Sequence, residues 1–284
     1  MATDVPFRQS DRIIDHVVPL VQVESHDSGL KVTAFLGTGF ICGENLGMTA
    51  HHVLNEETPP SVGIVINHQQ KWHYCSISGV ETHPVEDVCL FTLEQLDEDV
   101  SWQSFLRPSS APQYASLNYS LWGYPADVLY EVVHGGFASP RPDLVYSEGH
   151  VRRRMSDISL EHLRGRNFYE LSQRGGSGFS GGPVISNRSL GPSSVWQVVG
   201  IYIGERVSGE GISVGYATRL DSIAAWRPAL LNGSSIFGDE DSSVVTGSQP
   251  RARRLPRAGY ASRRAGQSSG MGDNGWPSAS TLTR

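Results

Sequence analysis

Three short stretches of the sequence carry residue types that could together cleave an acyl bond. They are GMTAHHVL (47–54) with His51 and His52, HPVEDVCLFTL (83–93) with Asp87, and GGSGFSGGPVIS (175–186) with Ser180. A serine hydroxyl is a weak nucleophile, so it needs a base, an acid that orients the base, and N–H groups that stabilise the oxyanion. Histidine, aspartate and a glycine-rich serine loop are the residue types for these tasks. The three stretches therefore predict acyl-transfer chemistry.

The order of these residues along the chain separates two known frameworks. GxSxG also marks the nucleophile elbow of α/β-hydrolases, where the catalytic histidine follows the serine. The last histidine of this chain is His162, which precedes Ser180, so no base lies downstream. The order histidine, aspartate, serine belongs to the other framework, and the chain follows it.

The residues alone leave an alternative open for each candidate. Adjacent strand residues point to opposite faces, so either His51 or His52 could face the serine, but not both. The glycine-rich stretch could be a flexible spacer, or Ser177 could be its nucleophile. Asp87 could be a solvated carboxylate beside Glu86. A metal site could be built from His51, His52, His73, Cys75 and His83. The spacing of that last set matches no zinc pattern.

Short apolar segments separated by turn residues predict an all-β fold. The chain contains 31 glycines and 16 prolines, and long helical periodicity is scarce. Two sets of candidate strands are 17–23, 30–42, 48–50, 62–66, 72–78 and 87–93, then 116–125, 143–153, 167–173, 181–186, 196–204 and 211–218. Two sets of six predict two six-stranded antiparallel β-barrels.

The expected organisation is one domain over residues 1–232, followed by a tail. Its parts are an N-terminal barrel at about 17–96, a connector at 97–115, a C-terminal barrel at about 116–220 and a C-terminal helix at 221–231, where Asp221 or Ser222 would be the N-cap. Residues 233–284 are rich in Ser, Gly, Pro and Arg and hold seven arginines against four acidic residues. Such a composition predicts a disordered basic tail.

The ordered motifs TAHHV, EDVCLF and GFSGGPV resemble those of the trypsin-like (chymotrypsin-fold) serine peptidases. The stretches GTGFICGENLG, LWGYP, VVGIYIG and VGYAT are similar to further parts of that family, and the resemblance covers roughly residues 17–231. Val53 stands where secreted members carry a cysteine, so the chain resembles the bacterial and intracellular branch. The resemblance implies a chymotrypsin-like pair of barrels and a serine endopeptidase acting on proteins or peptides.

The resemblance also implies a role for each candidate residue. Ser180 would attack the substrate carbonyl, His52 would be the base, and Asp87 would orient the histidine. The N–H groups of Gly178 and Ser180 would form the oxyanion hole, and no cofactor or metal is expected. The residues expected to bind substrate are Arg174, Ile201, Tyr202, Ile203, Gly204, Val214 and Gly215.

Two positions depart from the family in ways that bear on specificity and control. Arg174 would lie near the floor of the primary specificity pocket, which predicts a preference for acidic side chains unless Arg174 points to solvent. Phe179 stands where secreted zymogens keep an aspartate that binds a new N-terminus. The resemblance therefore implies activity that is constitutive, or that is gated by a partner protein ordering residues 174–180. A catalytically silent docking module and an esterase are the competing functions.

Composition narrows the compartment and the partners. The three cysteines, Cys42, Cys75 and Cys89, predict free thiols in a reducing compartment, and we expect a cytoplasmic protein. Residues 1–20 lack the unbroken apolar core of a signal peptide, and no membrane contact is expected. The formal net charge of the chain is −6. Seven arginines against four acidic residues give the tail 7 − 4 = +3, so residues 1–232 carry −6 − 3 = −9. A solvated tail is favoured over one that contacts nucleic acid, because only Tyr260 lies among the arginines of 251–264.

Overall fold

The structure, a computed structural model, describes most of the first 238 residues. The described ranges are 13–26, 29–68, 71–94, 105–126, 129–134, 137–187, 196–207 and 213–238, all within the compact unit Met1–Ser243. Strands dominate these ranges, and their helices are the short 3-10 turns η2 (Ile13–Asp15), η4 (Leu220–Ile223) and η5 (Ala229–Leu231). No helix in this part of the chain has the length and apolar character needed to span a membrane. The predicted tail, with its arginine cluster, lies outside the described residues from 239 onward.

Six antiparallel strands close the first barrel in the order β1-β2-β3-β6-β5-β4. They are β1 (Val17–His26), β2 (Gly29–Gly43), β3 (Leu46–Thr49), β4 (Val62–His68), β5 (Lys71–Thr82) and β6 (Cys89–Leu93). Closure occurs because β1 pairs with both β2 and β4, with Leu20 opposite Ile64. Both of these side chains are fully buried and pack with Ile41 and Phe91 in the barrel core.

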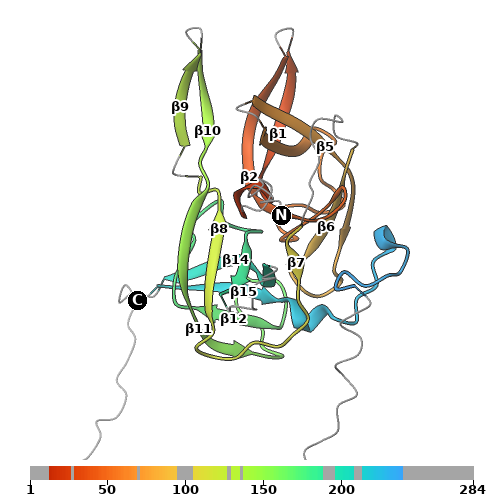
Figure 1. Cartoon of the computed structure of the whole chain (residues 1–284), viewed down its shortest axis with the longest axis vertical. Coiled ribbons are helices and arrows are strands. Elements are labelled where there is room, and N and C mark those ends of the chain that lie inside the picture. Colours follow the sequence, from red (N-terminus) through yellow and green to blue (C-terminus); the bar gives the residue numbers. More distant parts are fainter. Residues whose placement is uncertain are drawn as a thin grey trace, which may run out of the picture. The chain divides into compact units, whose positions relative to one another are not determined.

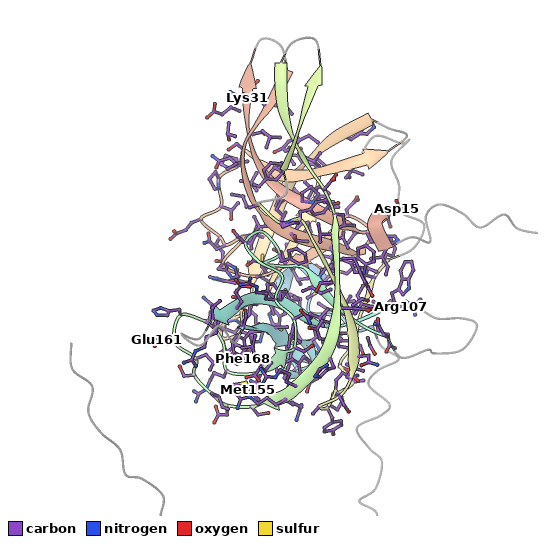
Figure 2. All side chains as sticks on the ribbon, turned by 90° about the vertical axis from the view of Figure 1, so that its left-hand side faces the viewer. Asp15, Lys31, Arg107, Met155, Glu161 and Phe168 are labelled. Atoms are coloured by element: carbon purple, nitrogen blue, oxygen red, sulfur yellow. The ribbon has the colours of Figure 1, made fainter. Side chains whose placement is uncertain are left out.

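The second barrel is also built from six strands. They are β8 (Asn118–Gly123), β11 (Val145–Met155), β12 (Phe168–Leu171), β13 (Pro183–Ser186), β14 (Gln197–Val207) and β15 (Ser213–Arg219). The sheet runs β13-β8-β11-β12-β15-β14, and pairing of β13 with β14 closes it. Figure 2 shows Met155 and Phe168, which are paired across β11 and β12, at the end of the molecule opposite Lys31 on β2. The prediction of two six-stranded barrels is confirmed.

Two elements were absent from the sequence prediction. Strands β9 (Leu129–His134) and β10 (Phe137–Pro142) pair as a separate two-stranded sheet. This sheet projects from the second barrel, and the β1–β2 hairpin projects from the first (Figure 1). In the expected connector, β7 (Arg107–Pro108) adds a short parallel edge to β14.

The predicted helix at 221–231 is wrong. The chain there makes two separate 3-10 turns, η4 and η5, with Pro228 between them in an extended conformation (φ −66°, ψ 145°). Proline lacks an N–H donor and disfavours a helical conformation for the residue before it, so a helix cannot pass Arg227 and Pro228. The carboxylate of Glu81 on β5 instead accepts hydrogen bonds from the N–H groups of Ala229 (2.9 Å) and Leu230 (2.8 Å). These bonds hold the segment after the second barrel against the first barrel.

A buried ion pair lies where β15 meets η4. Arg219 donates to both oxygens of Asp221, at 3.0 and 2.6 Å, and Arg154 donates to the same carboxylate at 2.6 Å. The Tyr169 hydroxyl donates a hydrogen bond to Asp221 Oδ1 at 3.2 Å. Burial acts to raise the pKa of Asp221, but the hydrogen bonds and charges of Arg219 and Arg154 outweigh it and hold the pKa below its usual value.

Asp221→Asn should lower the free energy of unfolding by about 3 kcal/mol, because the Arg219 guanidinium would stay buried without its carboxylate. For a domain of this size the melting temperature should fall by roughly 6–12 °C. Because the pKa of Asp221 is lower in the folded protein than the value of about 4 in the unfolded chain, its ionised carboxylate stabilises the fold fully at pH values above about 4. This stabilisation is lost as the pH falls through the lower pKa of the folded state. Urea unfolding of both proteins at pH 7 and pH 3 measures the effect.

Asp157→Asn is the matched control. Asp157 pairs with Arg166 at 2.7 Å, but its side chain is 81% exposed. An exposed pair contributes less than about 1 kcal/mol. Equal losses of unfolding free energy in Asp221→Asn and Asp157→Asn would contradict the expectation that the buried ion pair stabilises the fold more than the exposed one.

Candidate active site

The register between β3 and β6 brings His52 and Asp87 together. Thr49 at the end of β3 is paired with Cys89 at the start of β6. His52 follows Thr49 and Asp87 precedes Cys89, so both lie at the same edge of the first barrel. His52 Nδ1 lies 2.7 Å from Asp87 Oδ2, and the His52 backbone N–H donates to Asp87 Oδ1 at 3.1 Å. The imidazole is therefore oriented by a carboxylate that is itself buried.

His51 faces a different partner. Arg164 Nη1 donates to His51 Nε2 at 3.0 Å, and Nη2 of the same arginine donates to the carbonyl oxygens of His83 (2.9 Å) and Pro84 (3.2 Å). Burial, and after it the positive charge of Arg164, lowers the pKa of His51. His51 thus accepts a hydrogen bond as a neutral ring, whereas His52 is the ring that contacts Asp87.

Glu86 has a task distinct from that of its neighbour Asp87. Its carboxylate is buried and accepts hydrogen bonds from the backbone N–H groups of Arg166 (3.1 Å) and Asn167 (3.4 Å). The Asn167 side-chain amide donates to the other oxygen at 2.8 Å. Because residues 166–167 lead into β12, Glu86 ties the turn that carries Asp87 to the second barrel.

The loop that carries Ser180 is docked on Thr38 of β2. The Thr38 backbone N–H donates to the carbonyl oxygen of Ser180 at 2.8 Å, and the Thr38 hydroxyl donates to that of Gly178, also at 2.8 Å. The same hydroxyl accepts from the Tyr124 N–H at 2.9 Å. One buried threonine of the first barrel therefore holds two carbonyl groups of the serine loop.

The same loop has two free N–H groups whose directions are fixed. The Ala126 N–H donates to the carbonyl of Ser177 at 2.9 Å, and the Gly182 N–H donates to that of Phe179 at 2.8 Å. The C=O and N–H of a trans peptide point in opposite directions, so the N–H groups of Gly178 and Ser180 point away from these contacts. No described residue accepts a hydrogen bond from either group. Both can donate to a ligand without rearrangement.

Glycine is required at two positions of this loop. Gly178 has φ +90°, and a Cβ there would lie 2.4 Å from the Tyr124 carbonyl oxygen. Gly181 has φ +89°, and its Cβ would lie 1.9 Å from the Thr38 carbonyl oxygen. Both the left-handed conformation and the close backbone approach exclude a side chain. The glycines of GGSGFSGGPVIS are therefore parts of a built loop rather than a spacer.

Phe179 fixes the loop from the inside. Its side chain is 2% exposed, and a Cβ at either Gly123 or Gly175 would come within 2.6 Å of its atoms. Its ring meets that of Tyr202 edge-to-face, with centroids 6.3 Å apart. Aromatic packing therefore holds this position of the loop.

Ser180 lies close to the histidine-bearing edge. The Gly37 backbone separates the two, since a Cβ there would lie 2.8 Å from the Ser180 carbonyl oxygen and 2.9 Å from a methyl group of Val53, the neighbour of His52. The Ser180 hydroxyl makes no hydrogen bond to a described residue, and His52 Nε2 likewise has no described partner. The edge thus presents a serine, an oriented imidazole and two free N–H groups, a set that can attack a carbonyl and bind the resulting oxyanion.

The residues expected to bind substrate fall into two groups. Ile201, Tyr202, Ile203, Val214 and Gly215 are buried on β14 and β15, with Gly204 beside them. Arg174 is 56% exposed, and its Nη1 lies 3.8 Å from Glu205 Oε1. The arginine side chain is thus largely exposed and lies next to an opposite charge.

Sequence reasoning missed Thr38, Arg164 and the anchoring role of Glu86. Each acts through a partner far along the chain, such as Gly178, which is 140 residues from Thr38. Thr38 does lie in the GTGF stretch that contributed to the resemblance, but its contacts follow only from the fold.

Comparison with known proteins identifies the domain type. A family model described as the trypsin-like peptidase domain matches residues 37–201, more than half of the chain. That range includes the edge with His52 and Asp87 and the loop with Ser180. No curated protein sequence matches.

One solved structure with a TM-score above 0.5 shares the fold at low identity. The protease domain of MamO from Magnetospirillum magneticum, in its apo form, has a TM-score of 0.53 at 14% identity, covering 75% of this chain and 96% of that chain. The active form of the Rv3671c protease from M. tuberculosis has a TM-score of 0.49 at 17% identity, covering 78% and 83%. At 14% identity the likeness to the MamO protease domain concerns the fold alone.

Proposed function

The chain belongs to the trypsin-like peptidase domain family, and we propose that it is a serine endopeptidase that cleaves peptide bonds with His52, Asp87 and Ser180. The observation that carries the proposal is the 2.7 Å contact between His52 Nδ1 and Asp87 Oδ2, at the edge where the Ser180 loop docks. Its substrates are proteins or peptides.

In this mechanism Ser180 Oγ attacks the substrate carbonyl carbon while His52 Nε2 takes the hydroxyl proton. Asp87 accepts the hydrogen bond from Nδ1–H, which fixes the tautomer and stabilises the imidazolium. The oxyanion is held by the N–H groups of Gly178 and Ser180, each contributing about 2.7–4 kcal/mol to transition-state stabilisation. His52 then protonates the leaving amine, and water hydrolyses the acyl-enzyme by the same route.

The loop geometry supports constitutive activity over gating by a partner protein. The carbonyls of Ser177, Gly178, Phe179 and Ser180 all accept hydrogen bonds from within the chain. Phe179 is packed without an ion pair to a new N-terminus. These bonds support a loop that takes its oxyanion-binding conformation without N-terminal cleavage or a partner protein.

A docking module without catalysis is the second candidate function. The observation that favours it is that no hydrogen bond joins the hydroxyl of Ser180 to His52, two residues that the structure describes. Apo peptidases often show a long or misaligned contact here, so the observation does not decide between the two functions. The difference lies in whether Ser180 reacts.

Covalent labelling with a fluorophosphonate decides between them. The endopeptidase should be labelled at Ser180 with its original N-terminus intact, as read by intact mass and peptide mapping. His52→Ala should lose the labelling, because the hydroxyl then lacks its base. Absence of labelling in the folded wild-type protein would overturn the endopeptidase and favour the docking module.

The cysteines support a proposal on compartment. Cys42, Cys75 and Cys89 are all free thiols. Disulfides form and persist in oxidising compartments, so three free thiols are typical of a reducing one. We propose that the protein works in a reducing compartment, the cytoplasm.

Thr38→Val should lower kcat by about tenfold or more with little change in KM. Valine has the shape of threonine but leaves the Gly178 carbonyl and the Tyr124 N–H unpaired, at about 1–3 kcal/mol for each group. The loop that orients the oxyanion-binding N–H groups is then less firmly held. Steady-state kinetics on a peptide substrate measure the effect, and Thr38→Ser, which keeps the hydroxyl, should restore kcat.

Thr33→Val on the same strand is the matched control. Its hydroxyl makes an exposed bond to the Gln22 carbonyl at 3.3 Å, away from the serine loop. We expect wild-type kinetics from it. A Thr38→Val protein that matches Thr33→Val, or that changes KM alone, would show that Thr38 does not position the loop.

A further inference from the structure

Three segments lie next to Ser180 or to the strand joined to its loop. The first is residues 174–179, which lead into the serine. The second is β14, which is joined to the serine loop because the Gly181 N–H donates to the Tyr202 carbonyl at 2.8 Å and the Tyr202 N–H donates to that of Gly182 at 2.9 Å. The third is β15, which pairs along β14. If Ser180 attacks a peptide, the side chain just before the scissile bond lies beside Ser180, where these three segments are its described neighbours.

The side chain of Tyr202 spans all three segments. It starts on β14 and is 0% exposed. Its hydroxyl accepts a hydrogen bond from the Gly175 N–H at 2.9 Å. Its ring runs past β15, since a Cβ at Gly215 would lie 3.0 Å from Tyr202 Cε2, and the ring meets Phe179 edge-to-face.

Two hydrogen-bonding contacts and two packing contacts hold this ring in place. Besides accepting from Gly175, the hydroxyl lies 3.5 Å from Glu205 Oε2, to which it donates. Burial raises the pKa of the phenol, which keeps its proton for that contact. Moving the ring aside would break both hydrogen bonds and leave the Gly175 N–H unpaired.

We propose that Tyr202 fills the primary specificity pocket and restricts the residue before the scissile bond to a small side chain: glycine, alanine or serine. The inference rests on the proposed endopeptidase function and names its substrate class. A long aromatic, aliphatic or basic side chain would have to occupy the volume that the tyrosine ring already holds. A methyl or hydroxymethyl group needs only the mouth of the pocket.

The charges at the mouth argue against an acidic preference. Arg174 was expected near the floor of the pocket, but it is more than half exposed and lies 3.8 Å from Glu205 Oε1. An acidic substrate side chain would have to compete with this carboxylate for the guanidinium. Its own approach to Glu205 would be repulsive. The pair therefore leaves no uncompensated positive charge for an acidic substrate.

Phosphonate probes test the inference. One is a small fluorophosphonate without a peptide, and three are peptidyl diphenyl phosphonates that differ only in carrying alanine, phenylalanine or aspartate next to phosphorus. On the wild-type protein, the alanine probe should label Ser180 at least about tenfold faster than the other two peptidyl probes, because binding energy distinguishes side chains that fit from those that clash. Labelling rates come from intact mass spectra over time.

Two variants of Tyr202 separate its volume from its hydroxyl. Tyr202→Ala opens the space, so its ratio of alanine to phenylalanine labelling should fall by about tenfold or more. If melting curves show that Tyr202→Ala does not fold, Tyr202→Val is measured in its place. Tyr202→Phe is the matched control, since it keeps the ring and should keep the wild-type preference.

The outcomes distinguish the two proposals. Fluorophosphonate labelling combined with equal or faster reaction of the phenylalanine or aspartate probe in the wild type would overturn the filled pocket and leave the endopeptidase standing. An unchanged preference in a folded Tyr202→Ala or Tyr202→Val would overturn it too. No labelling by any probe would overturn the endopeptidase, and the pocket inference with it.

Discussion

Ser180→Ala should abolish peptide hydrolysis, with a fall in kcat of about a millionfold. We expect His52 and Asp87 not to replace the serine as nucleophile, because they are paired with each other at 2.7 Å and the Asp87 side chain is buried. The residual rate should come only from binding and from the Gly178 and Ser180 N–H groups, which the substitution leaves in place. The measurement is hydrolysis of a fluorogenic peptide library that is rich in alanine at the cleavage position.

The stability of Ser180→Ala should match the wild type. The hydroxyl has no hydrogen-bond partner among the described residues, and the carbonyl bond to the Thr38 N–H does not involve the side chain. We expect a change below about 0.5 kcal/mol in the free energy of unfolding. A loss of activity with an unchanged melting curve is therefore a loss of chemistry.

Ser177→Ala is the matched control for this prediction. Ser177 lies three residues earlier in the same loop and is exposed, and the bond it makes through its carbonyl to the Ala126 N–H survives the substitution. We expect kcat within about threefold of the wild type. Residual hydrolysis in Ser180→Ala that Ser177→Ala removes would show that Ser177 is the nucleophile.

The barrels and the order of the candidate residues were predictable because both follow from local patterns. Short apolar segments with turn residues between them specify strands. The register of β3 against β6 then follows from burying Met48 and Leu90 on one face, which brings the residues beyond the strand ends together. The helix prediction at 221–231 failed because apolar spacing was weighed above Pro228, a local signal that the sequence did contain.

The filling of the pocket could not be predicted from the sequence. Tyr202 lies in VVGIYIG, a continuous apolar run that indicates a buried strand but not what each side chain contacts. Its contact with Gly175 spans 27 residues, and its ring takes the space between strands that the resemblance assigns to substrate. Whether the Tyr202 ring or a substrate side chain occupies that space depends on the side-chain volumes in the folded protein. Thr38 presents the same difficulty, since its role exists only once the barrels have packed.

Neutralising the neighbouring carboxylates Glu86 and Asp87 should affect different properties of the protein, stability for Glu86 and kcat for Asp87. Asp87→Asn should lower kcat by about ten-thousandfold, because an amide at Oδ2 can donate to Nδ1 and so stabilise the wrong tautomer of His52. The unfolding free energy should change little by comparison. Steady-state kinetics and urea unfolding on the same preparations measure the two effects separately.

Glu86→Gln should instead cost stability. Its carboxylate accepts three N–H bonds from Arg166 and Asn167, and glutamine would turn an NH₂ group towards one set of donors. The loss should be about 2 kcal/mol in unfolding free energy, with kcat within about threefold of wild type at a temperature where the variant is folded. If Glu86→Gln lost activity like Asp87→Asn, the orienting acid would have been misassigned. Separate effects would show that one carboxylate orients the base and the other fastens its turn to the second barrel.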